Sequence, residues 1–540
     1  MGATATDCYY HRTLTESSPR VASRRPDRAF PGPKPGSSTV SARSNLLAPA
    51  GLGLLGALLA ALGSWNVSLW TDEAATISAA RRSTADLWQL VHHIDAVHAL
   101  YYFAIHFWGG AFGWSAFSLR LPSALAAGVT VVGVWALARA LDRPEAAVVA
   151  GIVAAVLPRL TWAGVEARSF GPSAAVAVWA TVVFVIALRS SRRWWIVYGA
   201  LLALGIALNI YLALVLVAHA VTLLVTERRR IPALWPWLAA AAAAVLAASP
   251  VVAESLGQRG QLGDTRVSAS TLVRQAVVNE FFLGQTPTRV GSVSDGHSAW
   301  SIAASALAAV CWALTVAGVV VQVRRRAVGG IGVLVPWLVV PTLVVAAYSL
   351  AASPLYNPRY FTFCAPAAAL LIALGIRTLP RWWMRGVAVL LVVALSVPIY
   401  WSQRQETGKS GTDWSAAAAY VAEHARVDDG VYFAPLDRTT TGPIERTTRN
   451  IAVAYPDAFA NLKDVTLEVS PTRNASLRGL SAPLADRAAE VANFDTVWVV
   501  RPADYPAASS ASDAGVFARA GFHEAASWRG PMDAVLEFTH

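Results

Sequence analysis

The stretch Ser68-Leu69-Trp70-Thr71-Asp72-Glu73-Ala74-Ala75-Thr76 follows directly on the first long apolar segment of the chain, residues 46–64. It places two adjacent carboxylates, Asp72 and Glu73, at the point where a hydrophobic helix ends. Because carboxylates are costly in hydrocarbon, we expect this pair at the boundary between membrane and water. Taken alone, the pair is also typical of an interfacial helix cap, with Thr71 or Asp72 as the N-cap. The rest of the chain decides between a cap and a functional site.

The composition is that of a protein with many membrane-spanning helices. Of 540 residues, 55% are hydrophobic and only 14% are charged, whereas soluble domains carry about 25% charged residues. The net charge of +11 lies largely in an N-terminal tail and in short arginine clusters between apolar runs. Nucleic-acid-binding proteins gather basic residues on one folded face; no such face is visible, so no nucleic-acid partner is expected. The cysteines, Cys8, Cys311 and Cys364, have neither metal-ligand spacing nor a disulfide framework.

Three regions follow from the pattern along the chain. Residues 1–44 are rich in Arg, Pro and Ser and are predicted to form a disordered basic tail in the cytoplasm. Residues 45–403 are predicted to form a transmembrane region, and residues 404–540 a domain outside the membrane. Several apolar runs are shorter than the ~20 residues of a straight span. The eleven predicted spans are 46–64, 121–140, 145–159, 170–189, 195–209, 212–226, 233–252, 299–322, 330–351, 361–377 and 386–402.

Basic clusters between the runs give this topology an orientation. They fall on alternate connections, so the positive-inside rule places all of them in the cytoplasm. These clusters are Arg139–Arg143, Arg189–Arg193, Glu227–Arg230, Arg324–Arg326 and Arg377–Arg385. The external segments are then 65–120, 160–169, 253–298, 352–360 and everything after 403. The aromatic stretch Ala99–Trp114 would break this alternation if it spanned, so we interpret it as a helix lying in the outer interface.

The external C-terminal region has the pattern of a small α/β domain. Residues 413–426 and 512–520 are predicted helices, the second with Ser512 or Asp513 as its N-cap. The predicted strands are 430–433, 494–500 and 534–538. The predicted fold class is therefore a mainly α polytopic membrane protein of about eleven spans, with interfacial helices in the first external loop and a C-terminal extracytoplasmic α/β domain.

Four groups of polar residues meet on the external side under this topology. Ionisable groups at membrane depth indicate function by default, because isolated ones cost a few kcal/mol. Each group alone also has a structural explanation, since an arginine can snorkel to lipid headgroups and neighbouring charges can pair within a loop. The groups are Asp72 with Glu73; His92, His93, Asp95 and His98; Glu166 with Arg168; and Asn357, Arg359 and Tyr360.

Several motifs occur in a characteristic order along the chain. They are Asp72-Glu73, the histidine-containing stretch before Leu100-Tyr101-Tyr102, Ser118-Leu119-Arg120-Leu121-Pro122-Ser123, Glu166-Ala167-Arg168-Ser169-Phe170 and Pro358-Arg359-Tyr360-Phe361. This order resembles the GT-C class of membrane glycosyltransferases, in the branch of the protein O-mannosyltransferases and the lipid A aminoarabinose transferase. The resemblance covers about residues 46–402, and the C-terminal domain matches only in position and size. It implies a helical bundle with interfacial helices and a large cavity at the outer surface.

Two departures from the family pattern concern candidate substrate contacts. Many relatives have a Pro-Pro pair where this chain has Val97-His98-Ala99, which leaves His98 open as a ligand or acceptor contact. Relatives often have tyrosine after the arginine of the second external loop, where this chain has Ser169-Phe170. The second departure removes a hydroxyl that could have contacted the donor.

The resemblance implies transfer of a sugar, with mannose as the first choice, from a polyprenyl-phosphate donor to an acceptor at the external face by inverting displacement. It gives Asp72 the role of general base, while Glu73 positions the acceptor or tunes Asp72. These roles suit the residue types, because a carboxylate can deprotonate a hydroxyl and a guanidinium matches phosphate oxygens. Arg168 and Arg359 are the candidates for the donor phosphate. The other candidate substrate contacts are His98, Tyr101, Arg120, Glu166 and Tyr360.

The residues require no cofactor, although a divalent metal at Asp72 with His98 is compatible with them. The expected partners are the lipid-linked sugar, a glycan, lipid or protein acceptor, and the lipids of the plasma membrane. One alternative is a transporter or lipid flippase, but the polar groups lie at span ends and the chain shows no internal repeat. Another is a non-catalytic scaffold that binds cell-wall polymer through residues 404–540.

Overall fold

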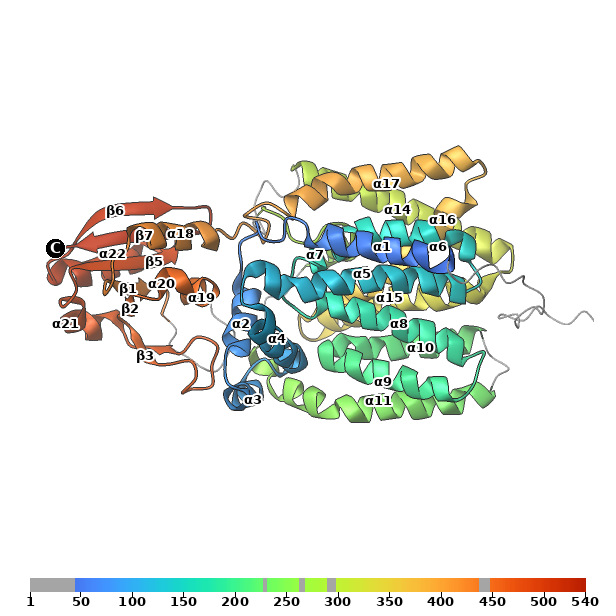
Figure 1. Ribbon diagram of the computed structural model, residues 1–540, viewed down its shortest axis with the longest axis horizontal. Coiled ribbons are helices and arrows are strands. Elements are labelled where there is room, and N and C mark those ends of the chain that lie inside the picture. The colour runs from blue at the N-terminus through green and yellow to red at the C-terminus, as the bar shows by residue number, and fades with distance from the viewer. Residues whose placement is uncertain (1–43, 227–230, 262–267, 289–297, 437–446) are drawn as a thin grey trace, which may run out of the picture.

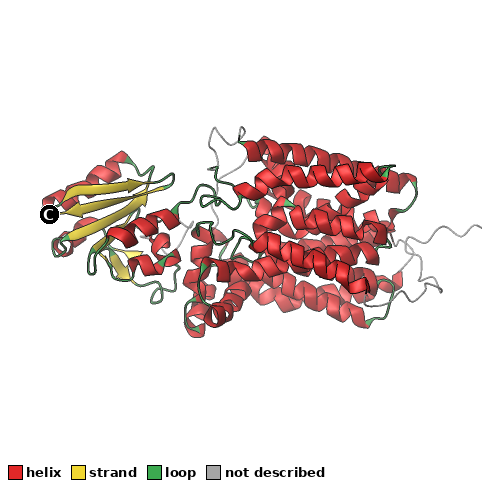
Figure 2. Cartoon of the chain, turned by 45° about the horizontal axis from the view of Figure 1, so that its top comes forward, coloured by secondary structure: helices red, strands yellow, loops and turns green. Residues whose placement is uncertain are grey.

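The computed structural model describes residues 44–226, 231–261, 268–288, 298–436 and 447–540, so the predicted disordered tail lies outside the described residues. A long bundle of helices and a smaller domain lie end to end along the longest axis (Figure 1). Strands occur only in the smaller domain within the described ranges (Figure 2).

The bundle has an apolar helix for each predicted span. Seven of these helices are long and apolar enough to cross a membrane, and the remaining four are shorter. The chain is thus a mainly helical, multi-pass membrane protein, and the topology with eleven spans remains our prediction. The bundle helices are α1 (Ser44–Ala61), α5 (Ala116–Ala140), α6 (Pro144–Val156), α8 (Phe170–Ala187), α9 (Arg193–Leu208), α10 (Ala213–Thr226), α11 (Ile231–Gly257), α14 (Ala299–Arg324), α15 (Val328–Ala351), α16 (Ala365–Thr378) and α17 (Trp382–Ser402).

Small residues allow a close helix contact in the bundle. Helices α14 and α16 pack with Gly318 against Gly375, and a Cβ atom on Gly375 would clash with the backbone carbonyl of Leu314. Helices in lipid pack by close backbone approach of this kind, because an apolar side chain gains little free energy when it moves from lipid into a helix interface.

Arginine-rich connections lie at the end of the bundle that is remote from the smaller domain (Figure 1). Arg189, after α8, pairs with Asp142, after α5, at 3.0 Å. Arg143 donates a hydrogen bond of 2.9 Å to Gln322 near the end of α14. These contacts tie three of the predicted cytoplasmic connections together, as the alternating topology requires. The cluster at 227–230 lies outside the described residues.

Short helices cover the other end of the bundle (Figure 1). α4 is not among the helices with the length and hydropathy of a span, which agrees with its interfacial interpretation. The N-cap prediction for α2 is wrong: Trp70, with extended backbone, occupies the N-cap, so Thr71 and Asp72 already belong to the first helical turn. The short elements are α2 (Thr71–Ala80), α3 (Thr84–His93), η1 (Ala96–His98), α4 (Ala99–Phe112), α7 (Pro158–Ala163), η2 (Ile210–Leu212), η3 (Arg259–Gln261), α12 (Ala269–Arg274), η4 (Gln275–Asn279), α13 (Glu280–Phe282) and η6 (Pro358–Cys364).

The C-terminal domain is built on a five-stranded mixed sheet with strand order β2-β1-β5-β7-β6. β1 pairs in parallel with β2 and β5, while β7 runs antiparallel to β5 and β6. β3 and β4 form a separate antiparallel pair. The strands are β1 (Gly430–Phe433), β2 (Lys463–Asp464), β3 (Leu467–Val469), β4 (Leu480–Ser481), β5 (Thr496–Pro502), β6 (His523–Arg529) and β7 (Asp533–Thr539). The helices are α18 (Trp414–His424), α19 (Arg449–Ala454), α20 (Pro456–Phe459), η7 (Leu484–Arg487), α21 (Ala488–Val491) and α22 (Ala507–Arg519).

The predicted strands correspond to β1, β5 and β7, but the edge strand β6 was not predicted. Most β6 side chains are exposed, so its sequence lacks the apolar pattern of a strand. α22 begins at Ala507, which makes the predicted N-cap at Ser512 or Asp513 wrong. Asp513 lies inside the helix, where its carboxylate accepts hydrogen bonds from Tyr432 at 3.0 Å and Tyr505 at 3.1 Å.

One hydrophobic core joins the C-terminal domain to the first external loop. Leu69, Ile77 and Tyr102 from this loop belong to the same buried cluster as Trp414 and Trp498 from the C-terminal domain. The opposite face of the sheet packs on α22 in a separate cluster. The C-terminal domain is therefore a packed part of the external surface, and it lies directly over the start of α2.

Candidate active site

Helix α2 presents two consecutive carboxylates to different surroundings. Successive residues on an α-helix point about 100° apart, so Asp72 and Glu73 cannot share one environment. Asp72 keeps 19% of its side chain exposed, whereas Glu73 is completely buried. Both lie in the first turn, where the helix dipole favours negative charge.

Two arginines from distant external segments converge on Asp72. Arg359, at the start of η6, brings Nη1 within 2.6 Å of Asp72 Oδ2. Arg168, between α7 and α8, brings Nη2 within 3.8 Å of Oδ1. The Nε atoms of both guanidinium groups are buried and find no hydrogen-bond partner among the described residues. The pair therefore keeps buried donor capacity that Asp72 does not use.

The charge of Asp72 is set by a competition between burial and these cations. Burial alone would raise the pKa of Asp72, but the charges of Arg359, Arg168 and Lys409 outweigh it, so the pKa lies below its ordinary value. Asp72 is thus ionised at neutral pH.

Glu73 and Arg120 form a closed ion pair beneath α2. Arg120 donates from Nε to Oε1 at 2.7 Å and from Nη2 to Oε2 at 2.5 Å. Its remaining donors bind the backbone carbonyls of Ser64, Val67 and Ser68, while Glu73 also accepts from the Ala167 N–H at 3.0 Å. Burial would raise the pKa of Glu73, but Arg120 keeps it below its ordinary value. Every charged atom of this pair is occupied, which leaves it no capacity for a ligand.

Arg168 is held by a relay through the first external loop. Its Nη1 donates to the Tyr102 hydroxyl at 2.9 Å, and Tyr102 donates to Asp95 at 2.7 Å. His98 lies beside this relay, and its buried Nδ1 has no partner among the described residues. Burial, and then the charge of Arg168, hold the pKa of His98 well below its ordinary value, so the ring is neutral at pH 7.

Glu166 faces a lysine that the sequence analysis did not single out. Lys409 Nζ contacts Glu166 Oε1, and both side chains are buried. Glu166 Oε2 accepts from the Trp70 indole N–H at 3.3 Å. Burial raises the pKa of Glu166 to about 7 against the opposing charge of Lys409, and burial lowers the pKa of Lys409.

The remaining predicted residues divide between the site and its periphery. Tyr101 is buried in the core of the first external loop. Tyr360 stacks on Tyr211, with ring centroids 5.2 Å apart, and Arg359 lies 5.5 Å from the Tyr360 ring. His92 and His93 are exposed at the end of α3, where their ring nitrogens contact backbone carbonyls of their own helix.

No group of three or more His, Cys, Asp or Glu side chains is arranged to hold a metal ion within the part of the chain that the structure describes. The metal site that the sequence left open, Asp72 with His98, would supply two such side chains. The described residues therefore offer arginine and lysine cations around Asp72 as the groups that can counter a negative ligand.

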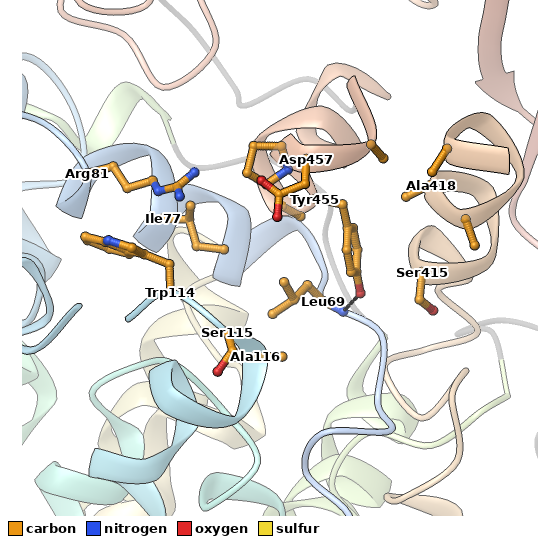
Figure 3. Close-up of a pocket in the computed structure, with 15 residues that line it drawn as sticks. Leu69, Ile77, Arg81, Trp114, Ser115, Ala116, Ser415, Ala418, Tyr455 and Asp457 are labelled. Atoms are coloured by element: carbon orange, nitrogen blue, oxygen red, sulfur yellow. Dashed lines mark hydrogen bonds between the residues drawn. The ribbon is translucent and has the colours of Figure 1, made fainter. Parts of the chain in front are cut away.

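A groove of about 630 Å³ lies where the C-terminal domain meets α2. Arg81 and Asp457 stand on its two sides, and the Tyr455 hydroxyl accepts from the Leu69 N–H at 2.8 Å (Figure 3). The groove uses Ile77 of α2, which lies about 140° around the helix from Asp72. It is therefore a space on the far face of α2 and not the surroundings of Asp72.

Sequence reasoning missed the groups that support the site. Lys409 is one of three lysines in the chain, with Lys34 and Lys463, and it lies just after the last predicted span. That isolation among 44 basic residues was a usable signal. The contributions of Trp70 and Tyr455 depend on tertiary packing and had no signal in the sequence.

Comparison with known proteins agrees with this fold. Residues 99–253 match the family model "Dolichyl-phosphate-mannose-protein mannosyltransferase". The apo structure of ArnT from Cupriavidus metallidurans aligns with a TM-score of 0.55 at 12% identity, covering 92% of this chain and 98% of that chain. The structure of the same ArnT bound to undecaprenyl phosphate aligns with a TM-score of 0.52 at 12% identity, over the same shares of both chains.

An oligosaccharyltransferase from Archaeoglobus fulgidus aligns with a TM-score of 0.48 at 12% identity, covering 87% of this chain and 70% of that chain. No curated protein matches the chain in sequence. The chain is a multi-pass membrane protein with a fold like that of ArnT, and its residues 99–253 resemble the dolichyl-phosphate-mannose-protein mannosyltransferase family, as the order of its motifs predicted.

Proposed function

We propose that the protein transfers a sugar from a polyprenyl-phosphate donor to an acceptor hydroxyl at the external face of the membrane. The observation that carries this proposal is the ionised Asp72 between two arginines whose buried Nε donors lack partners within the described ranges. A phosphate offers acceptor oxygens that match these free donors. The match to the mannosyltransferase family and the undecaprenyl phosphate in the ArnT structure support a lipid-linked donor.

In the proposed reaction, the acceptor oxygen attacks the anomeric carbon of the donor sugar. The new carbon–oxygen bond forms as the bond from that carbon to the phosphate oxygen breaks, and the phosphate oxygen keeps the electron pair. Asp72 takes the proton of the acceptor hydroxyl. Arg168 and Arg359 stabilise the charge that develops on the departing phosphate.

The contact between Arg359 and Asp72 gives this scheme a built-in order of events. Without donor, the 2.6 Å contact lowers the basicity of Asp72. A donor phosphate bound to Arg359 offsets part of that charge, and the pKa of Asp72 then rises. The base thus becomes stronger when the donor is in place, which limits unproductive proton uptake by the empty site.

Glu73 and Arg120 act, in our proposal, by fixing α2 and not by contacting substrate. Their charged atoms all have partners and both side chains are completely buried, so the pair is closed to a ligand. We keep His98, Tyr101, Glu166 and Tyr360 as residues around the substrate, with the neutral His98 as the candidate nearest to an acceptor hydroxyl. Mannose is the proposed sugar because the matching family is one of mannosyltransferases.

The test is transfer of radiolabelled sugar from polyprenyl phosphate into membrane product. Asp72→Asn is expected to lose about 10²- to 10⁴-fold of the rate, the contribution of a general base. Asp495→Asn, an exposed aspartate of the C-terminal domain, is the matched control and should keep wild-type activity. Wild-type rate in Asp72→Asn would remove Asp72 as the base. Comparison of polyprenyl-phosphate mannose with other lipid-linked sugars decides the sugar.

A further inference from the structure

Lys409 reaches the site from the segment that connects the last bundle helix to the C-terminal domain. This segment, residues 403–413, runs between α17 and α18. Lys409 is buried, although it belongs to a connecting loop. Its ammonium contacts Glu166, which lies in another external segment, 243 residues earlier in the chain. A buried lysine is rare unless it is paired. The loop places the Lys409 ammonium against its partner, Glu166.

Several hydrogen bonds fix the loop around Lys409. The Gln403 side-chain amide donates to the carbonyl of Leu283 at 2.7 Å. The Ser410 N–H donates to the carbonyl of Thr286 at 2.9 Å. The Thr412 hydroxyl donates to the carbonyl of Lys409 itself at 2.7 Å. The backbone that carries Lys409 is therefore held by contacts other than the ion pair with Glu166.

A continuous set of contacts runs from Lys409 to Asp72. Lys409 binds one carboxylate oxygen of Glu166, and the other oxygen accepts from the Trp70 indole N–H. The Trp70 ring lies 5.3 Å from the guanidinium carbon of Arg359. Arg359 in turn contacts Asp72. The chain of contacts thus crosses four external segments and ends on the proposed base.

We propose that Lys409 is a positioning residue: it orients Glu166 so that Glu166 holds the Trp70 indole, and the indole supports Arg359 at Asp72. This inference rests on the proposed sugar transfer and names a further residue for it. It also gives the C-terminal region a role in the reaction, because the loop that carries Lys409 ends directly in α18 and the sheet domain.

The charges around Lys409 predict how its removal changes the pKa of Asp72 and the pH dependence of the rate. Glu166 and Glu73 attract the ammonium, and Arg120 repels it. Lys409 in turn is one of the cations that lower the pKa of Asp72. Removal of the lysine therefore raises the pKa of Asp72, and the acidic limb of the rate profile moves to higher pH. A lysine whose charge had no influence on Asp72 would lower stability without this kinetic change.

The first experiment compares Lys409→Met with Trp70→Phe in the sugar-transfer assay. Each is expected to lower kcat and raise the KM for the donor, by a factor on the order of ten to a hundred for a small misplacement of Arg359. The double variant should be no worse than Lys409→Met, because both changes break the same chain of contacts. Lys463→Met, which breaks an exposed lysine–aspartate pair in the C-terminal domain, is the matched control.

The second experiment exchanges the two charges in the variant Glu166→Lys with Lys409→Glu. The exchange restores an ion pair, but an ammonium has only donors and cannot accept from the indole N–H. We expect the thermal midpoint to recover toward wild type while kcat stays low. Recovery of both properties would show a structural ion pair only and would overturn the inference. If the exchanged protein is not recovered folded, the Trp70→Phe kinetics decide, and wild-type values there overturn it.

These outcomes separate the inference from the proposed function. Transfer by the wild-type protein together with unchanged kinetics in Lys409→Met overturns the role of Lys409 alone. Absence of transfer by the wild-type protein overturns the proposed function, and the role of Lys409 falls with it.

Discussion

Replacement of Arg359 by glutamine removes the cation nearest to Asp72 and keeps a polar side chain of similar reach. In the wild-type protein, burial raises the pKa of Asp72 and the surrounding cations more than offset it. Arg359 is the largest of these cationic contributions. Loss of its charge therefore disfavours the ionised carboxylate, and the pKa of Asp72 rises.

The size of this effect follows from the contact distance. Arg359 Nη1 and Asp72 Oδ2 are 2.6 Å apart, which places the two charge centres about 4 Å apart. At an effective dielectric constant of about 20, charges at that separation interact by about 4 kcal/mol. This corresponds to about a thousandfold in the ionisation equilibrium of Asp72. Arg168, at 3.8 Å, remains and limits the change.

The assay is the pH dependence of kcat/KM for transfer from a radiolabelled polyprenyl-phosphate sugar. Asp72 must be ionised to act as a base, so the wild-type rate should stay constant as the pH falls into the mildly acidic range. As the pH falls, the rate of Arg359→Gln should begin to decrease at a higher pH than the wild-type rate does. The variant should also bind the donor more weakly. The control is Arg381→Gln, an equal charge change on an exposed side chain at the other end of the bundle. A profile of Arg359→Gln that parallels wild type would refute the electrostatic coupling.

Three further predictions concern stability and the support of α2. Arg120→Met should cost about 3–5 kcal/mol of stability, measured as thermal unfolding in detergent, because Glu73 is left buried and unpaired; a wild-type midpoint would contradict this. Burial raises the pKa of Glu280 to about 7. A raised pKa means that the folded state favours protonated Glu280. This contribution to the free energy of unfolding is fully present below pH 4.5 and is lost as the pH rises through 7, a loss of about 3 kcal/mol. Glu280→Gln should flatten that decline, and an unchanged slope would exclude Glu280 as its source. Tyr455→Phe removes the acceptor of the Leu69 N–H and should cost about 1–2 kcal/mol, checked by the same melts; equal stability would show that water replaces the hydroxyl.

The helical bundle could be predicted because spanning helices carry their signal in local composition. Each predicted run contains a helix, and the aromatic stretch that was excluded as a span forms α4 at the bundle end. The failures lie where tertiary contacts decide. The edge strand β6 has exposed side chains and depends on pairing with β7. Helix α2 begins after Trp70, which has an extended backbone and makes no side-chain capping hydrogen bond, so the sequence carries no N-cap signal at this point.

The candidate site could be predicted in its chemistry but not in its connections. The topology placed Asp72, Arg168 and Arg359 on one side of the membrane, and the structure brings them into contact. The sequence did not distinguish the surroundings of Asp72 from those of Glu73, because adjacent carboxylates are equivalent until their partners are known. Nor did it find Lys409, whose contact with Glu166 closes over 243 residues of chain.

The division between the two adjacent carboxylates explains why a pair is needed. In the proposed reaction the general base needs some exposure, and Asp72 keeps 19% of its side chain exposed. A base in such a position must also resist movement when its neighbouring arginines exchange partners with a phosphate. Glu73, one residue later, supplies that resistance because Arg120 ties it to the carbonyls that precede α2. In the proposed mechanism, Asp72 therefore exchanges its contacts while the helix that carries it stays fixed, and neither carboxylate could do both.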